Sequence, residues 1–236
     1  YPQKNLFSHI LGQIDDDNNG ISGIEKFFDY ELKKRDEPLI LTVDSDIQFL
    51  IREELIKAQE VFQNIGSASI LMNVNNGNII SMVSLPDFDL NKRQDISDLN
   101  YINRATKGVY ELGSVFKTFT FAAALNEGEI EPETPFIDLE KKIYCAGRPI
   151  GEYDDKIPAN LTAEQILIRS GNIGSVRIGQ KLGIERLRLF LENLGILSKI
   201  NFDIEEVGKP LSFKWGKCKL ATASFGHGIT TTPLQL

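Results

Sequence analysis

The stretch Tyr110-Glu111-Leu112-Gly113-Ser114-Val115-Phe116-Lys117-Thr118-Phe119-Thr120 places a serine directly after a glycine and three residues before a lysine. An apolar, alanine-rich segment follows and runs to Gly128, so the pattern predicts a helix from about Ser114 to this glycine. Positions i and i+3 share one helix face, which puts the Ser114 hydroxyl beside the Lys117 amine. The unpaired N–H groups of the first turn can also donate to an anion. One helical turn therefore offers a nucleophile, a base and an oxyanion donor.

A Ser-x-x-Lys match alone is weak evidence, because a pattern of four residues occurs by chance in most proteins. A lysine on an exposed helix face is usually only solvated. The catalytic interpretation therefore depends on the rest of the chain.

The size and charge of the chain exclude some classes of function. Its 236 residues allow one large domain or one domain with an appendage, and 42% hydrophobic residues are normal for a sizeable core. The net charge of −7 gives no basic footprint, so no nucleic-acid partner is expected. No apolar run is long enough to span a membrane. The start at Tyr1 and the end at Leu236 suggest an internal piece of a longer protein, with any membrane anchor upstream.

Cysteine and histidine usage predicts neither a disulfide framework nor a metal site. The two cysteines, Cys145 and Cys218, are expected to be buried or idle thiols, and a single bridge between them is left open. The histidines are His9 and His227, and no Cys-x-x-Cys occurs. We therefore expect no metal and no cofactor.

An acidic run near the start imitates a calcium loop, with Asp15, Asp17 and Asn19 at alternate positions before Gly20. An EF-hand needs a bidentate acid at the twelfth position of its loop. Lys26 stands there, so an acidic turn that leads into a helix is the better interpretation.

The strands are predicted to lie in the first half of the chain. Period and turn signals indicate a hairpin over 69–74 and 78–83 around Asn75-Asn76-Gly77, whose Asn-Gly step suits a tight antiparallel turn. Ahead of it we expect a long helix over 45–62 with a capping box of Ser45 and Gln48. A helix over 22–34 and a strand over 38–43 complete this half.

The second half reads as helical. Thr162 and Gln165 match a second capping box, and further helices are expected over 173–182 and 184–194. Strands before helices indicate an α+β domain with a helical subdomain. One hairpin and one strand make a thin sheet, so more strands are expected after Leu236.

At this point the motifs resemble those of class B penicillin-binding proteins. The stretch from Tyr110 to Lys117 is similar to the family's active-site motif, and several other segments match family motifs in family order. The pattern is most similar to the division-specific, FtsI-type branch. The matching segments are His9-Ile10-Leu11-Gly12, Gly20-Ile21-Ser22-Gly23-Ile24-Glu25, Leu41-Thr42-Val43-Asp44, Asn75 to Met82, Asn103-Arg104-Ala105, Ser170-Gly171-Asn172, Phe225-Gly226-His227-Gly228 and Thr232-Pro233-Leu234-Gln235-Leu236.

The resemblance implies a penicillin-binding/serine β-lactamase-like transpeptidase fold, with an antiparallel sheet (incomplete here) and a helical subdomain. Residues 1–37 would be the end of an N-terminal pedestal and linker, and residues 38–236 the transpeptidase domain. The family's third motif, Lys-Thr/Ser-Gly, occurs nowhere in the sequence and is expected beyond Leu236. The isolated chain is therefore expected to be an impaired enzyme.

The resemblance also implies a function, a peptidoglycan D,D-transpeptidase that cross-links stem peptides during septal cell-wall synthesis. Ser114 would attack a D-Ala-D-Ala peptide with Lys117 as base, and β-lactam antibiotics would acylate the same serine. Ser170 would relay a proton, Asn172 would bind the substrate amide, and the Ser114 N–H would supply half of the oxyanion hole. The implied setting is the bacterial inner membrane, with the catalytic domain on the periplasmic side among membrane-bound cell-wall synthesis partners.

Two alternatives remain open: a β-lactamase-like or penicillin-sensing domain of the same fold, and a non-catalytic division scaffold. The Glu-x-x-Leu-Asn element of class A β-lactamases is absent from the region 203–210, which favours a β-lactam target. A scaffold has no need to keep both Ser-x-x-Lys and Ser-x-Asn. His227 is weighed as a base for Ser114 and set aside, because no acid is placed to orient it.

Overall fold

The computed structural model describes residues 1–92 and 99–236, and the chain divides into two units that are not continuous in sequence. Unit 1 is built from Tyr1–Val109, Lys199–Lys209 and Thr232–Leu236. Unit 2 is built from Tyr110–Ser198 and Pro210–Thr231. All the residues of the predicted site therefore belong to unit 2.

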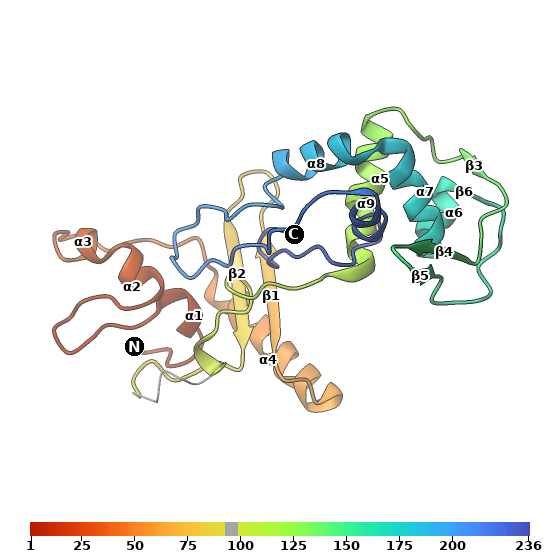
Figure 1. Cartoon of the computed structure of the whole chain (residues 1–236). Coiled ribbons are helices and arrows are strands. Elements are labelled where there is room, and N and C mark those ends of the chain that lie inside the picture. Colours follow the sequence, from red (N-terminus) through yellow and green to blue (C-terminus); the bar gives the residue numbers. More distant parts are fainter. Residues whose placement is uncertain (93–98) are drawn as a thin grey trace. The chain divides into compact units, whose positions relative to one another are not determined.

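A two-stranded antiparallel hairpin lies at the centre of unit 1 (Figure 1). Strand β1 (Ser67–Met72) pairs with β2 (Ile79–Leu85), and Gly77 takes a φ of +75° in the turn between them. Only glycine adopts such a φ without steric strain, which is why the Asn-Gly step suits this turn. The predicted hairpin is confirmed, with its strands moved by about two residues.

The long helix α4 (Ser45–Phe62) packs against β2, as expected, but its predicted capping box is wrong. Asp44 is the N-cap, because its carboxylate accepts the N–H groups of Asp46 at 3.0 Å and Ile47 at 2.9 Å. The Gln48 side chain is instead buried and bonds to β2. It accepts from the Ser81 hydroxyl at 2.6 Å.

The strand predicted over 38–43 does not form. This segment meets β2 through a Thr42 hydroxyl that donates to the Ile79 carbonyl at 2.7 Å, and the Asp44 N–H donates to the Ile80 carbonyl at 2.9 Å. No ladder of backbone hydrogen bonds joins it to β2, so it stays extended but unpaired. Its apolar side chains Leu39, Leu41 and Val43 are only partly buried against the core of unit 1, and Ile40 is exposed, so the composition that suits a strand serves partial packing here.

Short helices form the rest of unit 1. They are α1 (Ser8–Leu11), α2 (Gly23–Phe27), α3 (Asp29–Leu32) and the 3-10 turn Leu99–Tyr101. The helix predicted over 22–34 is thus broken at Phe28. The core beneath these elements is built from Ile10, Ile24, Ile79, Met82, Ala105, Ile204 and Leu234.

The acidic run is a turn, as predicted. The Asp15 carboxylate accepts the N–H of Asp17 at 2.9 Å and of Asn19 at 2.8 Å, so it closes the turn internally. Among residues 1–92 and 99–236, no group of three or more His, Cys, Asp or Glu side chains is arranged to hold a metal ion.

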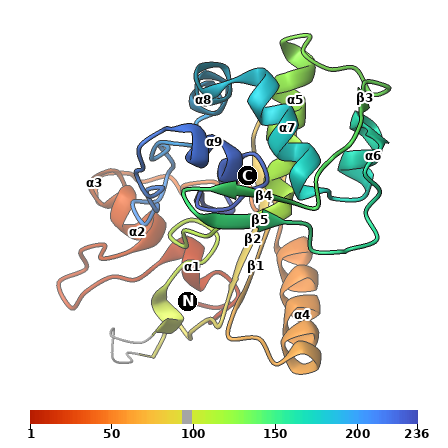
Figure 2. The ribbon, with the colours of Figure 1, turned by 45° about the vertical axis from the view of Figure 1, so that its right-hand side comes forward.

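Helices dominate unit 2, in agreement with the sequence. Helix α5 (Lys117–Asn126) lies beside α7 (Asn172–Leu182), and α8 (Ile184–Asn193) and α9 (Lys217–Ala223) pack around this pair (Figures 1 and 2). The helices predicted over 173–182 and 184–194 are confirmed. Their fully buried side chains include Ile173, Val176, Ile178, Leu187 and Leu191.

Two small antiparallel pairs of strands border these helices. Strand β3 (Pro135–Phe136) pairs with β6 (Leu161–Thr162), and β4 (Lys142–Cys145) pairs with β5 (Arg148–Gly151). Helix α6 (Ala163–Ile168) follows β6 and starts with the predicted capping box of Thr162 and Gln165.

The two cysteines form a disulfide, so the expectation of two idle thiols is wrong. Cys145 at the end of β4 is bonded to Cys218 in α9, across 73 residues of sequence. Neither partner lies near the other in sequence, which is why the bridge could not be inferred from spacing. It fastens the β4–β5 hairpin to the helices of unit 2.

In the part of the chain that the structure describes, no helix combines the length and apolar character required to cross a membrane.

Candidate active site

The nucleophile turn begins as a tighter helix than predicted. Residues Gly113–Phe116 form a 3-10 turn, with Gly113 at a φ of +58°, and α5 starts only at Lys117. Ser114 is exposed, whereas Lys117 is 1% exposed. The Lys117 Nζ lies 3.1 Å from Ser114 Oγ, so the predicted pairing of the two side chains is present.

The Ser-x-Asn segment surrounds the same amine. Lys117 Nζ lies 2.9 Å from Ser170 Oγ, 2.5 Å from the Ser170 carbonyl oxygen and 2.8 Å from Asn172 Oδ1. All four site residues predicted from the sequence, Ser114 and Lys117 with Ser170 and Asn172, therefore meet at one atom. A proton on this nitrogen can reach either serine hydroxyl directly.

The charge state of this amine is set chiefly by burial. Loss of solvent around Lys117 lowers the pKa of its ammonium from 10.5 to about 8, because the charged form loses hydration. The negative charge of Glu152 acts in the opposite direction and raises the pKa. A lysine of this pKa is partly neutral near neutral pH, as a general base has to be.

The backbone around the Ser-x-Asn segment is under tension. Ser170 has a φ of +54°, in the left-handed region that favours glycine. This conformation ends α6 and turns the chain into α7, whose first residue is Asn172. Asn172 Nδ2 donates to the Gly151 carbonyl at 2.9 Å, which leaves Oδ1 to face the lysine.

Glu152 is a residue of this site that the sequence reasoning missed. Its carboxylate accepts the Asn172 N–H on Oε2 at 2.6 Å and the Ile173 N–H on Oε1 at 2.9 Å. It therefore caps the start of α7, although it lies 20 residues ahead of Asn172 in the sequence. Local capping patterns cannot reveal it, because the acid reaches the helix only through the fold of the β4–β5 hairpin.

The Phe225-Gly226-His227-Gly228 segment packs against the nucleophile turn, Gly113–Phe116. Gly226 has a φ of +87°, and a Cβ there would lie only 1.8 Å from the Gly113 carbonyl oxygen. Only glycine permits this approach. The chain on either side is joined by reciprocal backbone hydrogen bonds between Tyr110 and Thr231, at 2.9 and 3.0 Å.

His227 has an acidic neighbour, which corrects one argument made from the sequence. Glu111 Oε2 lies 3.3 Å from His227 Nδ1, so an acid does orient this ring. Both side chains are open to solvent, and the ring stacks on Phe225. The hydroxyl of Ser114 instead has the buried amine of Lys117 as its partner, which retains Lys117 as the base that the geometry favours.

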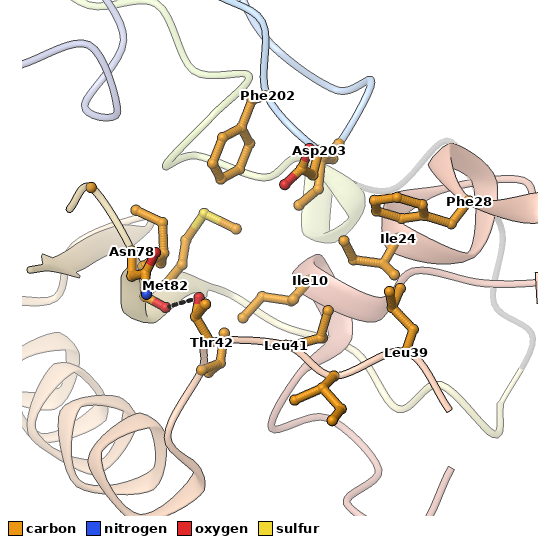
Figure 3. Close-up of a pocket in the computed structure, with 15 residues that line it drawn as sticks. Ile10, Ile24, Phe28, Leu39, Leu41, Thr42, Asn78, Met82, Phe202 and Asp203 are labelled. Atoms are coloured by element: carbon orange, nitrogen blue, oxygen red, sulfur yellow. Dashed lines mark hydrogen bonds between the residues drawn. The ribbon is translucent and has the colours of Figure 1, made fainter. Parts of the chain in front are cut away.

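An apolar pocket of about 320 Å³ lies in unit 1 (Figure 3). Its walls are mainly Ile, Leu, Phe and Val side chains, and Asp203 is the one ionisable residue in its lining. The lining contains no serine, cysteine, lysine or histidine, so this pocket carries no nucleophile or base for covalent chemistry.

An exposed serine paired with a buried lysine of lowered pKa, with a second serine on the same amine, is the arrangement expected of proteins that transfer acyl groups through a serine. The chain belongs to the penicillin-binding protein transpeptidase family, since the model described as penicillin binding protein transpeptidase domain matches residues 67–236.

The relatives point to the same family. The chain is 33% identical to the probable peptidoglycan D,D-transpeptidase FtsI of Caulobacter vibrioides, over all of this chain and 41% of that protein. It is 29% identical to stage V sporulation protein D of Bacillus subtilis, again over 100% of this chain and 41% of the relative. The chain thus spans less than half the length of these curated relatives.

Solved structures confirm the fold. Penicillin binding protein 3 of Mycobacterium tuberculosis, in its apo form, matches all of this chain with a TM-score of 0.87 at 23% identity, over 56% of that chain. The same protein complexed with ampicillin also gives a TM-score of 0.87. The predicted α+β class and the penicillin-binding transpeptidase fold are therefore confirmed.

Proposed function

We propose that this chain belongs to a septal peptidoglycan D,D-transpeptidase that cross-links stem peptides through an acyl-enzyme on Ser114. The observation that carries the proposal is the position of Lys117 Nζ, within hydrogen-bond distance of both Ser114 Oγ and Ser170 Oγ. The names of the relatives, peptidoglycan D,D-transpeptidases of the FtsI type among them, support the choice of substrate and of the septal role.

In the first step, neutral Lys117 takes the hydroxyl proton of Ser114 as Ser114 Oγ attacks the carbonyl between the two D-alanines. The C–O bond forms first, and the C–N bond then breaks as the tetrahedral intermediate collapses. The proton passes from Lys117 through Ser170 Oγ to the leaving amine of the last D-alanine, which departs neutral. The short distances from the amine to both hydroxyls support this route.

In the second step, an amine of a neighbouring stem peptide attacks the ester carbon of the acyl-enzyme. Its proton returns through the same groups to Ser114 Oγ as the C–O bond breaks, which forms the cross-link and restores the serine. Splitting one difficult substitution into two lowers the barrier for each. A β-lactam carbonyl offered to Ser114 undergoes the first step only, which would make the protein a β-lactam target.

Asn172 is assigned to the substrate's amide backbone, and the Ser114 N–H to one side of the oxyanion hole. The exposed Ser114 and the anchored Asn172 support these roles. No Lys-Thr-Gly or Lys-Ser-Gly triplet occurs in residues 1–236. Because one lost oxyanion donor slows acyl transfer by roughly a hundred- to a thousandfold, we expect the isolated chain to be impaired relative to a protein that carries this motif.

The proposed organisation follows the family resemblance. Residues 1–37 are assigned to the end of an N-terminal pedestal and linker, and residues 38–236 to the transpeptidase domain. We place this domain on the periplasmic side of the bacterial inner membrane, with membrane-bound cell-wall synthesis proteins as partners. The Cys145–Cys218 disulfide supports that side, since disulfides persist in oxidising compartments.

The test is acylation of the full-length protein by a fluorescent penicillin. We expect a label that resists denaturation, persists for many minutes and is lost in Ser114→Ala. An unlabelled wild-type protein would remove the enzymatic proposal and leave the non-catalytic scaffold. A label that is released within seconds would identify a β-lactamase-like activity instead.

A further inference from the structure

We infer that Glu152 is a positioning residue for the proposed acyl transfer, whose carboxylate fixes the start of the helix that carries Asn172. The inference rests on the proposed function, and it goes beyond the two family motifs that supply Ser114, Lys117, Ser170 and Asn172.

The contact geometry is that of a bidentate helix cap. Each carboxylate oxygen of Glu152 accepts one hydrogen bond. Oε2 accepts from the Asn172 N–H at 2.6 Å, and Oε1 accepts from the Ile173 N–H at 2.9 Å. These are the first two N–H groups of α7, which have no carbonyl partner within the helix. The Gly171 N-cap position lacks a side chain, so no local residue can supply this cap.

The end of strand β5 also anchors the side chain of Asn172. Residue Gly151, directly before Glu152, accepts the Asn172 side-chain amide on its carbonyl oxygen at 2.9 Å. The backbone and the side chain of Asn172 are therefore both fixed by residues 151–152. The β4–β5 hairpin that ends there is itself tied to α9 by the Cys145–Cys218 disulfide.

The charge of Glu152 has a separate consequence. Burial lowers the pKa of the Lys117 ammonium, and the negative charge of Glu152 acts in the opposite direction and raises it. Glu152 thus limits how far the lysine is deprotonated. A cap made by a neutral side chain would hold the helix without this effect, and the difference can be measured.

Glu152→Gln tests the cap and the charge of Glu152 in a chain that should still fold. A glutamine keeps the length of the side chain but presents an NH₂ group to one of the two N–H donors, which breaks half of the cap. It also removes the charge. Glu152→Asp keeps the charge with a shorter reach and serves as the conservative rescue.

Asp44→Ala is the matched control for the loss of a helix cap. Asp44 caps α4 in unit 1 through two N–H groups, as Glu152 caps α7. Asp44 belongs to unit 1, whereas the site residues belong to unit 2. Its loss is expected to lower the melting temperature and to leave acylation unchanged.

The experiment follows acylation of the full-length protein by a fluorescent penicillin between pH 6.5 and 9.5, where the rate rises to a plateau. For Glu152→Gln we expect the plateau rate to fall about tenfold or more through misplacement of Asn172. We also expect the midpoint of the rise to move down by about half a pH unit, because the negative charge is gone. Glu152→Asp should keep the midpoint of the wild type.

A plateau within about twofold of the wild type, or a fall in rate with an unmoved midpoint, would overturn the inference. Amide hydrogen exchange gives a readout that does not depend on activity. The N–H groups of Asn172 and Ile173 should exchange at least about tenfold faster in Glu152→Gln than in the wild type. Unchanged exchange rates would show that Glu152 does not cap α7. An unlabelled wild-type protein would instead overturn the proposed function, and the exchange rates would still show whether Glu152 caps α7.

Discussion

Lys117 Nζ lies 3.1 Å from Ser114 Oγ, and the two side chains differ in exposure, since the lysine is 1% exposed and the serine is open to solvent. Such a pair lets an incoming carbonyl reach the Ser114 hydroxyl while the Lys117 amine stays shielded from water. The pKa of Lys117, lowered to about 8, should therefore govern the rate of acylation.

The acylation rate of the wild-type protein should rise with pH around a midpoint near pH 8 and level off about one pH unit above it. The neutral amine is the base, and at pH 7 only roughly a tenth of it is neutral when the pKa is about 8. Burial disfavours the charged form, so the rise occurs well below the ordinary lysine value of 10.5. The measurement is stopped-flow labelling by a fluorescent penicillin, and a midpoint near 10.5 would contradict the assignment.

Replacement of Lys117 by arginine should abolish this pH dependence and slow acylation by about a hundred- to ten-thousandfold. A guanidinium keeps its positive charge and can still donate to Ser170 and Asn172, but it cannot accept the Ser114 proton. Circular dichroism establishes whether the variant is folded. Rapid labelling of a folded Lys117→Arg protein would assign the base to another residue, with His227 as the next to test.

Two substitutions at Ser170 should differ in their effect on stability, while both slow acylation. Ser170→Gly relieves the positive φ of +54° and should raise the free energy of unfolding by about 1 kcal/mol. Ser170→Ala keeps the unfavourable backbone and should not stabilise. Both variants lose the hydroxyl that relays the proton. Denaturant unfolding and penicillin labelling on the same samples check the two effects, and full activity in either variant would exclude the relay.

Gly226→Ala should disturb the nucleophile turn. Its Cβ would lie 1.8 Å from the Gly113 carbonyl oxygen, so the backbone has to move, at a loss of about 2 kcal/mol or more of stability. We expect acylation to slow as well, because Gly113 directly precedes Ser114.

Gly147→Ala is the control for that variant. Gly147 has a comparable φ of +78°, but nothing lies within 4 Å of its added Cβ. It should lose only about 1 kcal/mol from backbone strain and keep its activity. Equal losses in the two variants would show that the approach to Gly113 is unimportant.

Removal of the disulfide should loosen unit 2. In the chain-entropy description, a bridge across 73 residues stabilises by about 4 kcal/mol, so Cys145→Ser with Cys218→Ser should lower the melting temperature by several degrees. Reduction of the wild-type protein should have the same effect. An unchanged melting temperature in the double variant would mean that packing alone holds the β4–β5 hairpin to α9.

The sequence was sufficient for features that depend on local pattern. The hairpin around Gly77, the capping box at Thr162 and the pairing of Ser114 with Lys117 each follow from residues a few positions apart, and all are present. The Ser-x-Asn segment carries no local sign of chemistry, and its assignment came from the order of motifs along the chain.

Apart from the capping box at Ser45 and the helix break at Phe28, the features that were missed depend on distant contacts. Glu152 reaches Asn172, Cys145 reaches Cys218, and Glu111 reaches His227 only because the chain folds back, so no window of sequence contains both partners. The strand predicted over 38–43 failed for a related reason. Its composition suits a strand, but strand formation requires a partner, and β2 offers it only isolated hydrogen bonds.

The disulfide also encloses only part of the site in its covalent loop. The bond between Cys145 and Cys218 closes a loop of chain that contains Ser170 and Asn172, whereas Ser114 lies before the loop begins. A protease that cut once within residues 146–217 would therefore leave two pieces still joined. On a gel run without reductant, the labelled protein would keep its full mass. With reductant, the penicillin label would travel with the N-terminal piece alone, which maps the acylated serine without any substitution.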